Sequence, residues 1–363
     1  MGRLALLALA ALASQVAPVT IAAQVQEAVF EDDETPIGTN RIGWAVDLSG
    51  DCAIASSAGQ HDGLTGYLYA YRRTGSSWTE EQVFKGATTD EGDWFGMDVA
   101  IDGDVVVGGA PGVSDGEAGM PGFHRGAAWV FRHLGGWVEE ARLQPESVLE
   151  HDRFGAAVAV SGDVIVVGAP GVDGWTEEAG QMEESGAAYV FRRVAGTWVE
   201  EVRLTAWDGG PHQHFGSAVA ASGDTIAIGA EGNLEAEGFS GAVYVYRFDG
   251  TAWNVEQRIA AASGARDDRF GAALDLEGEV LAVGAPREQA AGQPKAGRVH
   301  VLRRSGAVWS EEAVLQAPAP RVTDNFGYSV SLGLDQLLVG VPGDDTLGGQ
   351  SGSAAHFRRS AGV

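Results

Sequence analysis

The chain has 363 residues and a formal net charge of −26, and these values exclude several partners. The excess of 50 acidic over 24 basic residues repels phosphate backbones and anionic lipid headgroups, so we expect neither nucleic acid nor a membrane surface to bind. The 53 glycines, with only 12 prolines, indicate many turns between short strands rather than collagen or disorder. Cys52 is the only cysteine, which excludes an intramolecular disulfide, and its place on a predicted strand favours a small buried hydrophobe.

The first 23 residues have the features of a secretory signal peptide. Arg3 supplies the positive charge, Leu4 to Leu12 form an apolar run, and small residues precede a cleavage site before Gln24. A membrane span needs about 20 apolar residues, and polar residues interrupt this one, so we expect cleavage rather than anchoring. The predicted mature domain, residues 24–363, is secreted to the extracellular space or the periplasm, is a monomer and does not insert into a membrane.

One sequence unit occurs six times along the rest of the chain. Each copy opens with an apolar residue and a glycine, and a small-residue turn follows thirteen residues after that glycine in every copy. The opening pairs are Ile42-Gly43, Phe95-Gly96, Phe154-Gly155, Phe215-Gly216, Phe270-Gly271 and Phe326-Gly327. A constant spacing inside repeats of variable length places the length changes in loops.

Each copy divides into four strand-like runs, which are clearest in the third copy. Residues Ala156–Val160 predict a first strand, Ser161-Gly162-Asp163 a tight hairpin turn, and Val164–Val167 a second strand buried on both faces. Residues Gly186–Phe191 predict the third strand, and Trp198–Leu204 an outer fourth strand with one wet face. Repeated units of four short antiparallel strands are typical of propeller blades. We therefore predict an all-β fold, a six-bladed β-propeller of four-stranded antiparallel blades.

Two side-chain patterns recur in the fourth strands. A tryptophan in regular register is predicted to pack between blades rather than to stack on carbohydrate. These tryptophans are Trp78, Trp137, Trp198, Trp253 and Trp309. Paired glutamates are predicted to be surface strand positions rather than catalytic acids, because neighbouring strand residues face opposite ways. These pairs are Glu80-Glu81, Glu139-Glu140, Glu200-Glu201 and Glu311-Glu312.

The ring is predicted to close by strand exchange between the two ends of the chain. In the last copy, the place of the fourth-strand tryptophan falls just after Val363. Residues 24–30 match the pattern of Trp198–Leu204 and lead into Ile42-Gly43. This N-terminal strand is expected to complete the last blade and to remove an exposed sheet edge.

These residues resemble the FG-GAP repeats of the integrin α-subunit propeller, and the bacterial extracellular subgroup with the pattern FGxxVAxxGDxxxVGAPG…GAAYVF…W is the closest match. The resemblance covers essentially the whole mature chain. It implies the propeller fold and, more weakly, a recognition or adhesion role, since a fold does not fix an activity. Integrin propellers have seven blades, whereas six copies occur here.

Several integrin blades also bind calcium through a DxDxDG stretch between their first two strands. Here that position holds only short turns, such as Asp102-Gly103-Asp104. Calcium takes six to eight oxygen ligands, and one turn aspartate does not supply them. The resemblance therefore carries over no calcium site. No cofactor is expected, and calcium is the one alternative that the sequence leaves open.

Two adjacent copies have long insertions between the second and third strands, at Gly112–Arg125 and Gly171–Ser185. Under one hypothesis they form an acidic, aromatic rim that binds a cationic, sugar or protein partner. Under the other they are insertions that loops tolerate at little cost. The candidate ligand-binding residues are Trp175, Asp173, Glu177, Glu178, His124 and Arg125.

An acidic or amide residue lies three positions before the opening glycine in every copy. Such residues either hydrogen-bond a turn backbone or form a cation-attracting ring around one mouth of the central channel. The candidate channel-mouth ring is Asp93, Asp152, Asp268 and Asp324.

The remaining motifs favour binding over catalysis. His212 and His214 lie on one side of a loop, but two imidazoles without a third ligand rarely hold zinc. The sequence has no HExxH, GxSxG or P-loop motif. We therefore predict a non-catalytic extracellular recognition or adhesion module that binds a protein or glycan through the variable-loop face. The alternatives are a glycan-processing hydrolase or lyase with an acidic central site, and a structural surface component.

Overall fold

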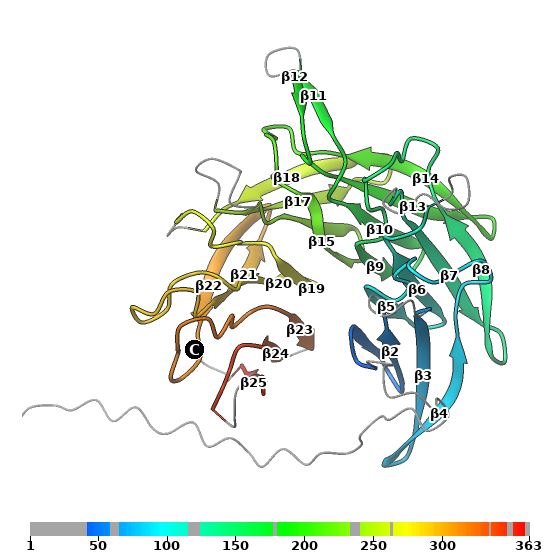
Figure 1. Ribbon diagram of the computed structural model, residues 1–363, viewed down its shortest axis with the longest axis horizontal. Helices are drawn as coiled ribbons and strands as arrows, with labels where there is room; N and C mark the ends of the chain where they lie inside the picture. Colours follow the sequence, from blue (N-terminus) through cyan, green and yellow to red (C-terminus); the bar gives the residue numbers. More distant parts are fainter. Residues whose placement is uncertain are drawn as a thin grey trace, which may run out of the picture.

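The computed structural model describes residues 42–58, 65–114, 124–176, 180–232, 240–261, 264–333, 335–346 and 351–359. In these ranges the regular secondary structure is β-strand, and six main antiparallel sheets are arranged in a ring as the blades of a propeller (Figure 1). The predicted all-β, six-bladed fold is confirmed. No helix within these ranges is long and apolar enough to cross a membrane.

The strands follow the chain from the centre of each blade to its outer edge. Blade 1 has β1 (Val46–Ser49), β2 (Cys52–Ser57), β3 (Tyr67–Thr74) and β4 (Ser77–Phe84). Blade 2 has β5 (Val99–Asp102), β6 (Val105–Ala110), β7 (Ala127–His133) and β8 (Trp137–Leu143). Blade 3 has β9 (Ala157–Ser161), β10 (Val164–Ala169), β13 (Ala187–Val194) and β14 (Thr197–Leu204).

The other three blades continue this order. Blade 4 has β15 (Phe215–Ser222), β16 (Thr225–Ala230), β17 (Ala242–Phe248) and β18 (Trp253–Ile259). Blade 5 has β19 (Ala273–Glu277), β20 (Val280–Ala285), β21 (Arg298–Ser305) and β22 (Val308–Leu315). Blade 6 has β23 (Val330–Gly333), β24 (Gln336–Val341) and β25 (Ser353–Arg358).

Blade 3 contains its four strands within one or a few residues of the predicted bounds. Blade 6 has three strands among the described residues, and the predicted closing strand at 24–30 lies outside them, as does the predicted signal peptide at 1–23. Cys52 is buried on β2, as predicted.

The insertion in blade 3 differs from the prediction. The sequence indicated one long polar loop over Gly171–Ser185, but the structure forms a second, two-stranded sheet there. It consists of β11 (Gly174–Thr176) and β12 (Gly180–Met182), paired antiparallel. The run is too short and too polar to show the period of a buried strand.

The Phe-Gly pair joins each blade to the preceding one. Phe215 is fully buried and pairs with Gly186, at the start of the third strand of blade 3. Gly216 has a φ of +89°, and a Cβ there would lie 2.2 Å from the carbonyl oxygen of Ala187. Only glycine allows both that backbone conformation and that approach, which explains the repeated glycine.

Five apolar clusters fill the boundaries between consecutive blades, from blades 1 and 2 to blades 5 and 6. Each cluster contains side chains from both blades, and the repeated tryptophans belong to these clusters or pack against them, except for Trp78, which packs against a cluster of blade 1. The prediction that they pack between blades is confirmed for the other four. Burial of one large apolar side chain contributes roughly 1.5–3 kcal/mol, so these boundaries hold the ring together.

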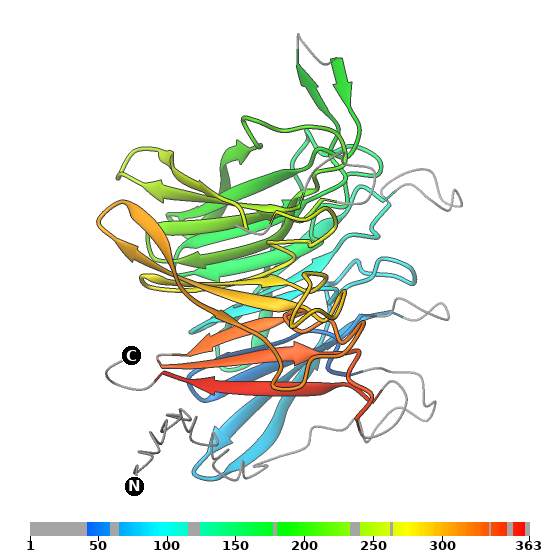
Figure 2. The ribbon, with the colours of Figure 1, turned by 90° about the vertical axis from the view of Figure 1, so that its left-hand side faces the viewer.

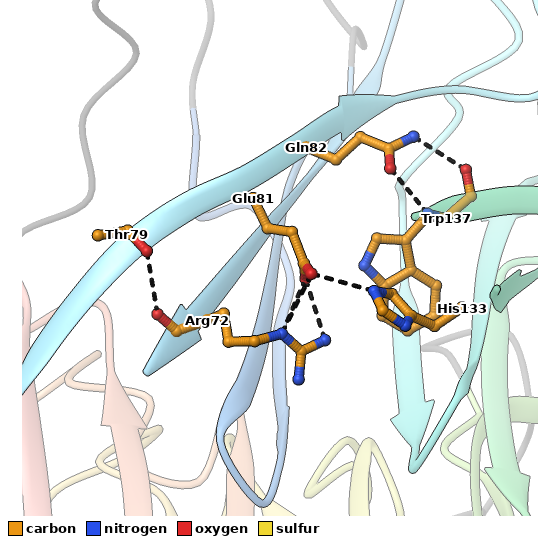
Figure 3. A network of polar contacts seen from close by, with 6 residues as sticks. All are labelled: Arg72, Thr79, Glu81, Gln82, His133 and Trp137. Carbon is orange, nitrogen blue, oxygen red and sulfur yellow. Dashed lines mark hydrogen bonds and ion pairs between the residues drawn. The ribbon is translucent and has the colours of Figure 1, made fainter. Parts of the chain in front are cut away.

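A repeated polar contact, here termed the glutamate node, lies at the outer edge of the boundaries. In blade 2, Glu140 accepts from Arg132 of its own blade at 3.2 Å, and from Arg193 and the Trp198 indole of blade 3 at 2.6 and 3.2 Å. At the boundary of blades 1 and 2, Glu81 contacts Arg72 and His133 instead (Figure 3). The other node glutamates are Glu201, Glu256 and Glu312.

The paired glutamates lie at the surface of the fourth strands, as predicted, with Glu140 partly buried, and these contacts add a role across the blade boundary that the prediction did not include. In each of the five fourth strands that the structure describes, the register shifts at the node glutamate, so that it is the extra residue of a β-bulge. A bulge re-aims its side chain, here toward the next blade. Strict alternation, on which the prediction was based, does not apply at that residue.

Candidate functional site

The candidate site lies on the loop face, the face that holds the connections from second to third strands and from each fourth strand to the next blade. There the β11–β12 hairpin projects beyond the main sheets (Figures 1 and 2). Its return segment is tied to the next connection, because the N–H of His212 donates to the Glu183 carbonyl at 2.7 Å and the N–H of His214 donates to the Glu184 carbonyl at 3.1 Å. The hairpin is therefore anchored at the boundary of blades 3 and 4.

Glu184 gathers three side chains at the foot of the hairpin. Its Oε2 lies 3.2 Å from Nε2 of His214 and 3.5 Å from Nδ1 of His212, and its Oε1 lies 3.7 Å from Nη2 of Arg153. Its own N–H donates to Oδ1 of Asp173 at 3.0 Å. Burial would raise the pKa of Glu184, but the neighbouring His214, Arg153 and His212 hold that pKa below its usual value. These five residues are termed the hairpin base.

The backbone of the hairpin base is left-handed at four non-glycine residues. Glu184, Arg153, His212 and His214 have φ values of 48°, 56°, 59° and 55°. Such conformations cost about 1–3 kcal/mol each and often mark functional sites. Here, however, blade 5 and its neighbour repeat the geometry at Lys295, Thr323 and Asn325. The strained backbone is a property of the repeat, and only the side chains distinguish the hairpin base.

A second feature of this face is Trp207, in the connection from blade 3 to blade 4. Trp207 is 54% exposed, and its ring lies roughly perpendicular to that of Tyr244, with 4.9 Å between the ring centroids. The Tyr244 hydroxyl donates to Asp208 at 2.7 Å, and Arg258 pairs with the same carboxylate at 2.8 Å. Sequence reasoning missed Trp207, although a tryptophan outside the repeated fourth-strand register was the available signal.

The structure disperses the predicted ligand-binding residues. Asp173 is exposed in the hairpin base, and Trp175 lies on β11, with its side chain outside the described part. His124 Nδ1 lies 3.0 Å from the Gly112 carbonyl of its own loop, and Arg125 Nε donates at 2.9 Å to the Val148 carbonyl in the connection from blade 2 to blade 3. Glu177 and Glu178, which were also predicted to bind the ligand, lie outside the described residues.

The four aspartates of the predicted channel-mouth ring serve their own turns. Each carboxylate accepts the N–H of the residue three positions earlier, at 2.7–3.0 Å. Burial raises the pKa of Asp152, and its nearest charges are Arg203, Asp173 and Arg125. Burial also raises the pKa of Asp268 to about 6, with Glu288 beside it. These neighbours are loop and strand residues, and no other member of the set is among them, as expected for turn-stabilising roles.

Three carboxylates that the sequence did not single out lie on the first strands of blades 1 and 5 and directly before the first strand of blade 2. Asp47, Asp98 and Asp275 each accept the next residue's N–H and an N–H from the first strand of the next blade. Burial raises the pKa of Asp47 to about 7 and that of Asp98 to about 6. One oxygen of each carboxylate thus binds its own blade and the other binds the next blade. In the described part of the chain, no three His, Cys, Asp or Glu side chains are grouped to hold a metal ion.

Comparison with known proteins gives one family. A model of the FG-GAP repeat matches residues 78–131, 137–191, 198–246, 253–302 and 309–355, which is more than half of the chain. No curated protein matches the sequence. The five matched stretches each begin at the repeated fourth-strand tryptophan, so each one spans the boundary between two consecutive blades.

Proposed function

Because the chain belongs to the FG-GAP repeat family, we propose that it is a non-catalytic recognition module that binds an extracellular protein or glycan on the loop face of blades 3 and 4. FG-GAP propellers are typically non-catalytic and suggest a protein-binding or adhesion-type module. The extracellular setting is supported by the predicted signal peptide, and the choice of face is supported by the features of the hairpin base and Trp207.

The observation that carries this proposal is the β11–β12 hairpin. Among the described connections from second to third strands, it is the one that forms a sheet of its own, and it projects beyond the blades (Figure 2). A projecting element adds contact area without changing the ring, which is how rigid scaffolds carry variable binding loops.

The side chains around the hairpin suit a polar partner. Trp207 presents an exposed aromatic surface, which stacks on sugar rings or covers aliphatic stems. Asp173 and Glu184 supply acceptors for hydroxyl, ammonium or guanidinium groups, while Arg153 supplies a donor. The net charge of −26 makes an anionic polymer a poor ligand.

A glycan array and a panel of immobilised cell-surface proteins test the proposal. We expect the full chain to bind a subset of these probes. Replacement of residues 174–182 by two glycines, and separately Trp207→Ala, should lower that binding at least tenfold without unfolding the ring. Val308→Ala, an exposed change on blade 5, is the control.

Binding that survives both changes would contradict the proposed site. Release of shortened glycans during the incubation would instead support the hydrolase or lyase alternative.

A further inference from the structure

The loop face of blade 5 carries a group of charged side chains around one carboxylate. Arg287 donates to both oxygens of Asp267, at 2.9 and 2.7 Å. Nε of Arg269 lies 3.6 Å from the Asp267 carboxylate, and Nζ of Lys295 lies 3.9 Å from it. Three cations thus share one carboxylate, in a chain whose net charge is −26. These four residues are termed the cationic cluster.

Blade 3 shows how the same positions are filled elsewhere in the ring. Arg153 and Arg269 are both the second residue before the opening glycine of their blade. Glu184 and Lys295 are both the second residue before the glycine that starts the third strand, with φ values of 48° and 54°. In blade 3, Arg153 lies 3.7 Å from Glu184. In blade 5 a lysine takes the place of that glutamate, so a second cation replaces the acceptor of the arginine.

The Arg269 guanidinium is left without a hydrogen bond among the described residues. Its nearest acceptors are Asp267 and Glu231 of blade 4, each at 3.6 Å, and its Nε is buried with no hydrogen-bond partner. A buried donor without a partner costs about 1–3 kcal/mol. The Arg269 side chain is 30% exposed, so a bound molecule can reach it and supply the missing acceptors.

Arg287 occupies a position at which the other five copies of the repeat have glycine. These glycines are Gly59, Gly112, Gly171, Gly232 and Gly343. In blades 2, 3 and 6 a Cβ at this position would lie only 1.9–2.3 Å from a carbonyl oxygen. In blade 5 the backbone hydrogen bond from this position, to the Asp268 carbonyl, is 3.3 Å long, compared with 3.0–3.1 Å in those blades. Blade 5 therefore gives up a close backbone approach and gains the arginine that binds Asp267.

Glu231 adds an acceptor from blade 4 beside the cationic cluster. It replaces the proline that four other copies have in the small-residue turn, namely Pro111, Pro170, Pro286 and Pro342. Its carboxylate makes no hydrogen bond within the described part of the chain, and its side chain is 22% exposed. Burial raises the pKa of Glu231, although Arg269 and His214 act to lower that pKa. A carboxyl group of this kind accepts from a hydroxyl and, when protonated, donates to one.

We propose that the cationic cluster and Glu231 form a site for a sugar acid, in which Arg269 binds the carboxylate of the sugar. The guanidinium offers two parallel N–H groups to a carboxylate, and Lys295, whose side chain is 48% exposed, adds a second positive charge. Glu231 and Asp267 flank Arg269 and accept from neighbouring hydroxyl groups.

The charges of the site favour a sugar acid over other anions. The three cations and the two carboxylates leave a single net positive charge, which suits one carboxylate rather than a polyanion. The flanking carboxylates repel a doubly charged phosphate, whereas hydroxyl groups beside the bound carboxylate give them donors. The site shares no residue with the hairpin base or with Trp207, so it is a second binding site on the loop face.

Titration of the full chain with small probes, followed by ligand-detected nuclear magnetic resonance, tests the site. We expect sodium D-glucuronate to bind saturably. D-glucose lacks the carboxylate, acetate lacks the hydroxyl groups, and N-acetyl-aspartate carries the carboxylate of a protein side chain. Each of these three probes should bind at least tenfold more weakly than glucuronate. Because the probes are free small molecules, the result does not depend on the partner proposed for the hairpin base.

Two variants and one control locate the binding. Arg269→Gln should weaken glucuronate binding at least tenfold. Lys295→Glu restores the arrangement of blade 3 and gives Arg269 an acceptor within the chain, so it should also weaken binding at least tenfold without lowering the melting temperature. Arg247→Gln is the matched control, because Arg247 pairs with Asp224 in the turn between β15 and β16, and it should leave glucuronate binding unchanged.

Absence of glucuronate binding to the unaltered chain would overturn the proposal. Equal binding of acetate or N-acetyl-aspartate would also overturn it, since the site would then recognise a carboxylate without the sugar. Glucuronate binding that persists in a folded Lys295→Glu variant, or that falls as much in Arg247→Gln, would show that the sugar binds elsewhere or through the overall charge.

Discussion

The boundary of blades 3 and 4 shows what a complete boundary of this ring contains. Val166 and Val190 of blade 3 pack with Phe215 and Val219 of blade 4 in one buried cluster. Outside that cluster, Glu201 of blade 3 contacts Arg192 of its own blade at 3.0 Å and accepts from the Trp253 indole at 3.0 Å. The loop face above the same boundary carries the hairpin base.

The boundary of blades 6 and 1 uses the same positions with a different result. Where blade 3 has the two valines, blade 6 has Leu338 and His356, and both are exposed. Where blade 4 has Phe215 and Val219, blade 1 has the partly buried Ile42 and the exposed Val46. A repeat therefore specifies its strands locally, while the stability of each boundary depends on which side chains the neighbouring blade presents.

Truncation of one apolar side chain at each of the two boundaries should give the largest difference in unfolding free energy. Phe215→Ala removes a fully buried ring and should cost about 3–5 kcal/mol of unfolding free energy. The corresponding change at the open boundary, Ile42→Ala, should cost about 1 kcal/mol or less. Chemical denaturation of both variants measures the difference, and equal losses would show that the two boundaries are packed alike.

The node at the complete boundary should contribute the next largest effect. Glu201→Ala leaves Arg192 and the Trp253 indole without this acceptor and, because these contacts are exposed to solvent, should cost about 1 kcal/mol. Glu200→Ala changes the preceding, exposed residue of the same strand and should stay within about 0.5 kcal/mol. Similar losses for the two variants would restore the interpretation of the glutamate pair as plain surface.

The repeat made most of the fold predictable. The features in which a single blade departs from the repeat were not predictable from it. Turn residues and apolar runs located β9 and β10 because those strands obey simple periodicity. The bulge at Glu201 breaks that periodicity, so the contact of Glu201 with the next blade did not follow from the alternation. The meeting of Glu184 with His212 joins two blades across 28 residues of sequence, and no local pattern encodes it. The hydrogen bond that Asp152 makes with its turn was one of two hypotheses, and the structure shows it.

Blade 5 allows the role of buried charge to be separated from that of packing. His300 lies between Glu288 at 2.7 Å and Glu311 at 2.8 Å, and Glu288 also contacts Arg298 at 3.1 Å. Burial would lower the pKa of His300, but the two glutamates raise it above 6.5. Asp268, beside Glu288, has its pKa raised to about 6. In blade 3 the positions of Glu288 and His300 hold the apolar pair Val172 and Tyr189.

The direction of the pH effect follows from these shifts. A raised histidine pKa stabilises the fold fully below about pH 6.5, and this contribution is lost as pH rises through the folded pKa. The raised pKa of Asp268 acts in the same direction between about pH 4 and 6. We expect the unfolding free energy to fall as pH rises above 6.5, and to fall less in the Glu288→Val, His300→Tyr double variant. Denaturation at several pH values measures the slopes, and identical slopes would exclude His300 as the cause.

Calcium should have the smallest effect on the stability of the fold. The turns between first and second strands offer at most two carboxylates, as in Asp102-Gly103-Asp104, too few for the six to eight oxygen ligands that calcium takes. We expect the melting temperature to change by less than about 1 °C in millimolar calcium. Saturable heat in a calorimetric titration would contradict this expectation and would direct attention to the acidic loops.

Hydrogen exchange of the full chain, followed by mass spectrometry, tests most directly the claim that the ring is weakest between blades 6 and 1. Amides exchange through local openings whose free energies differ across a structure. We expect peptides of β23, β24, β25 and β1 to lose protection first, and those of β10, β13, β16 and β17 to lose it last. Uniform exchange around the ring, or earliest exchange in blades 3 and 4, would contradict it.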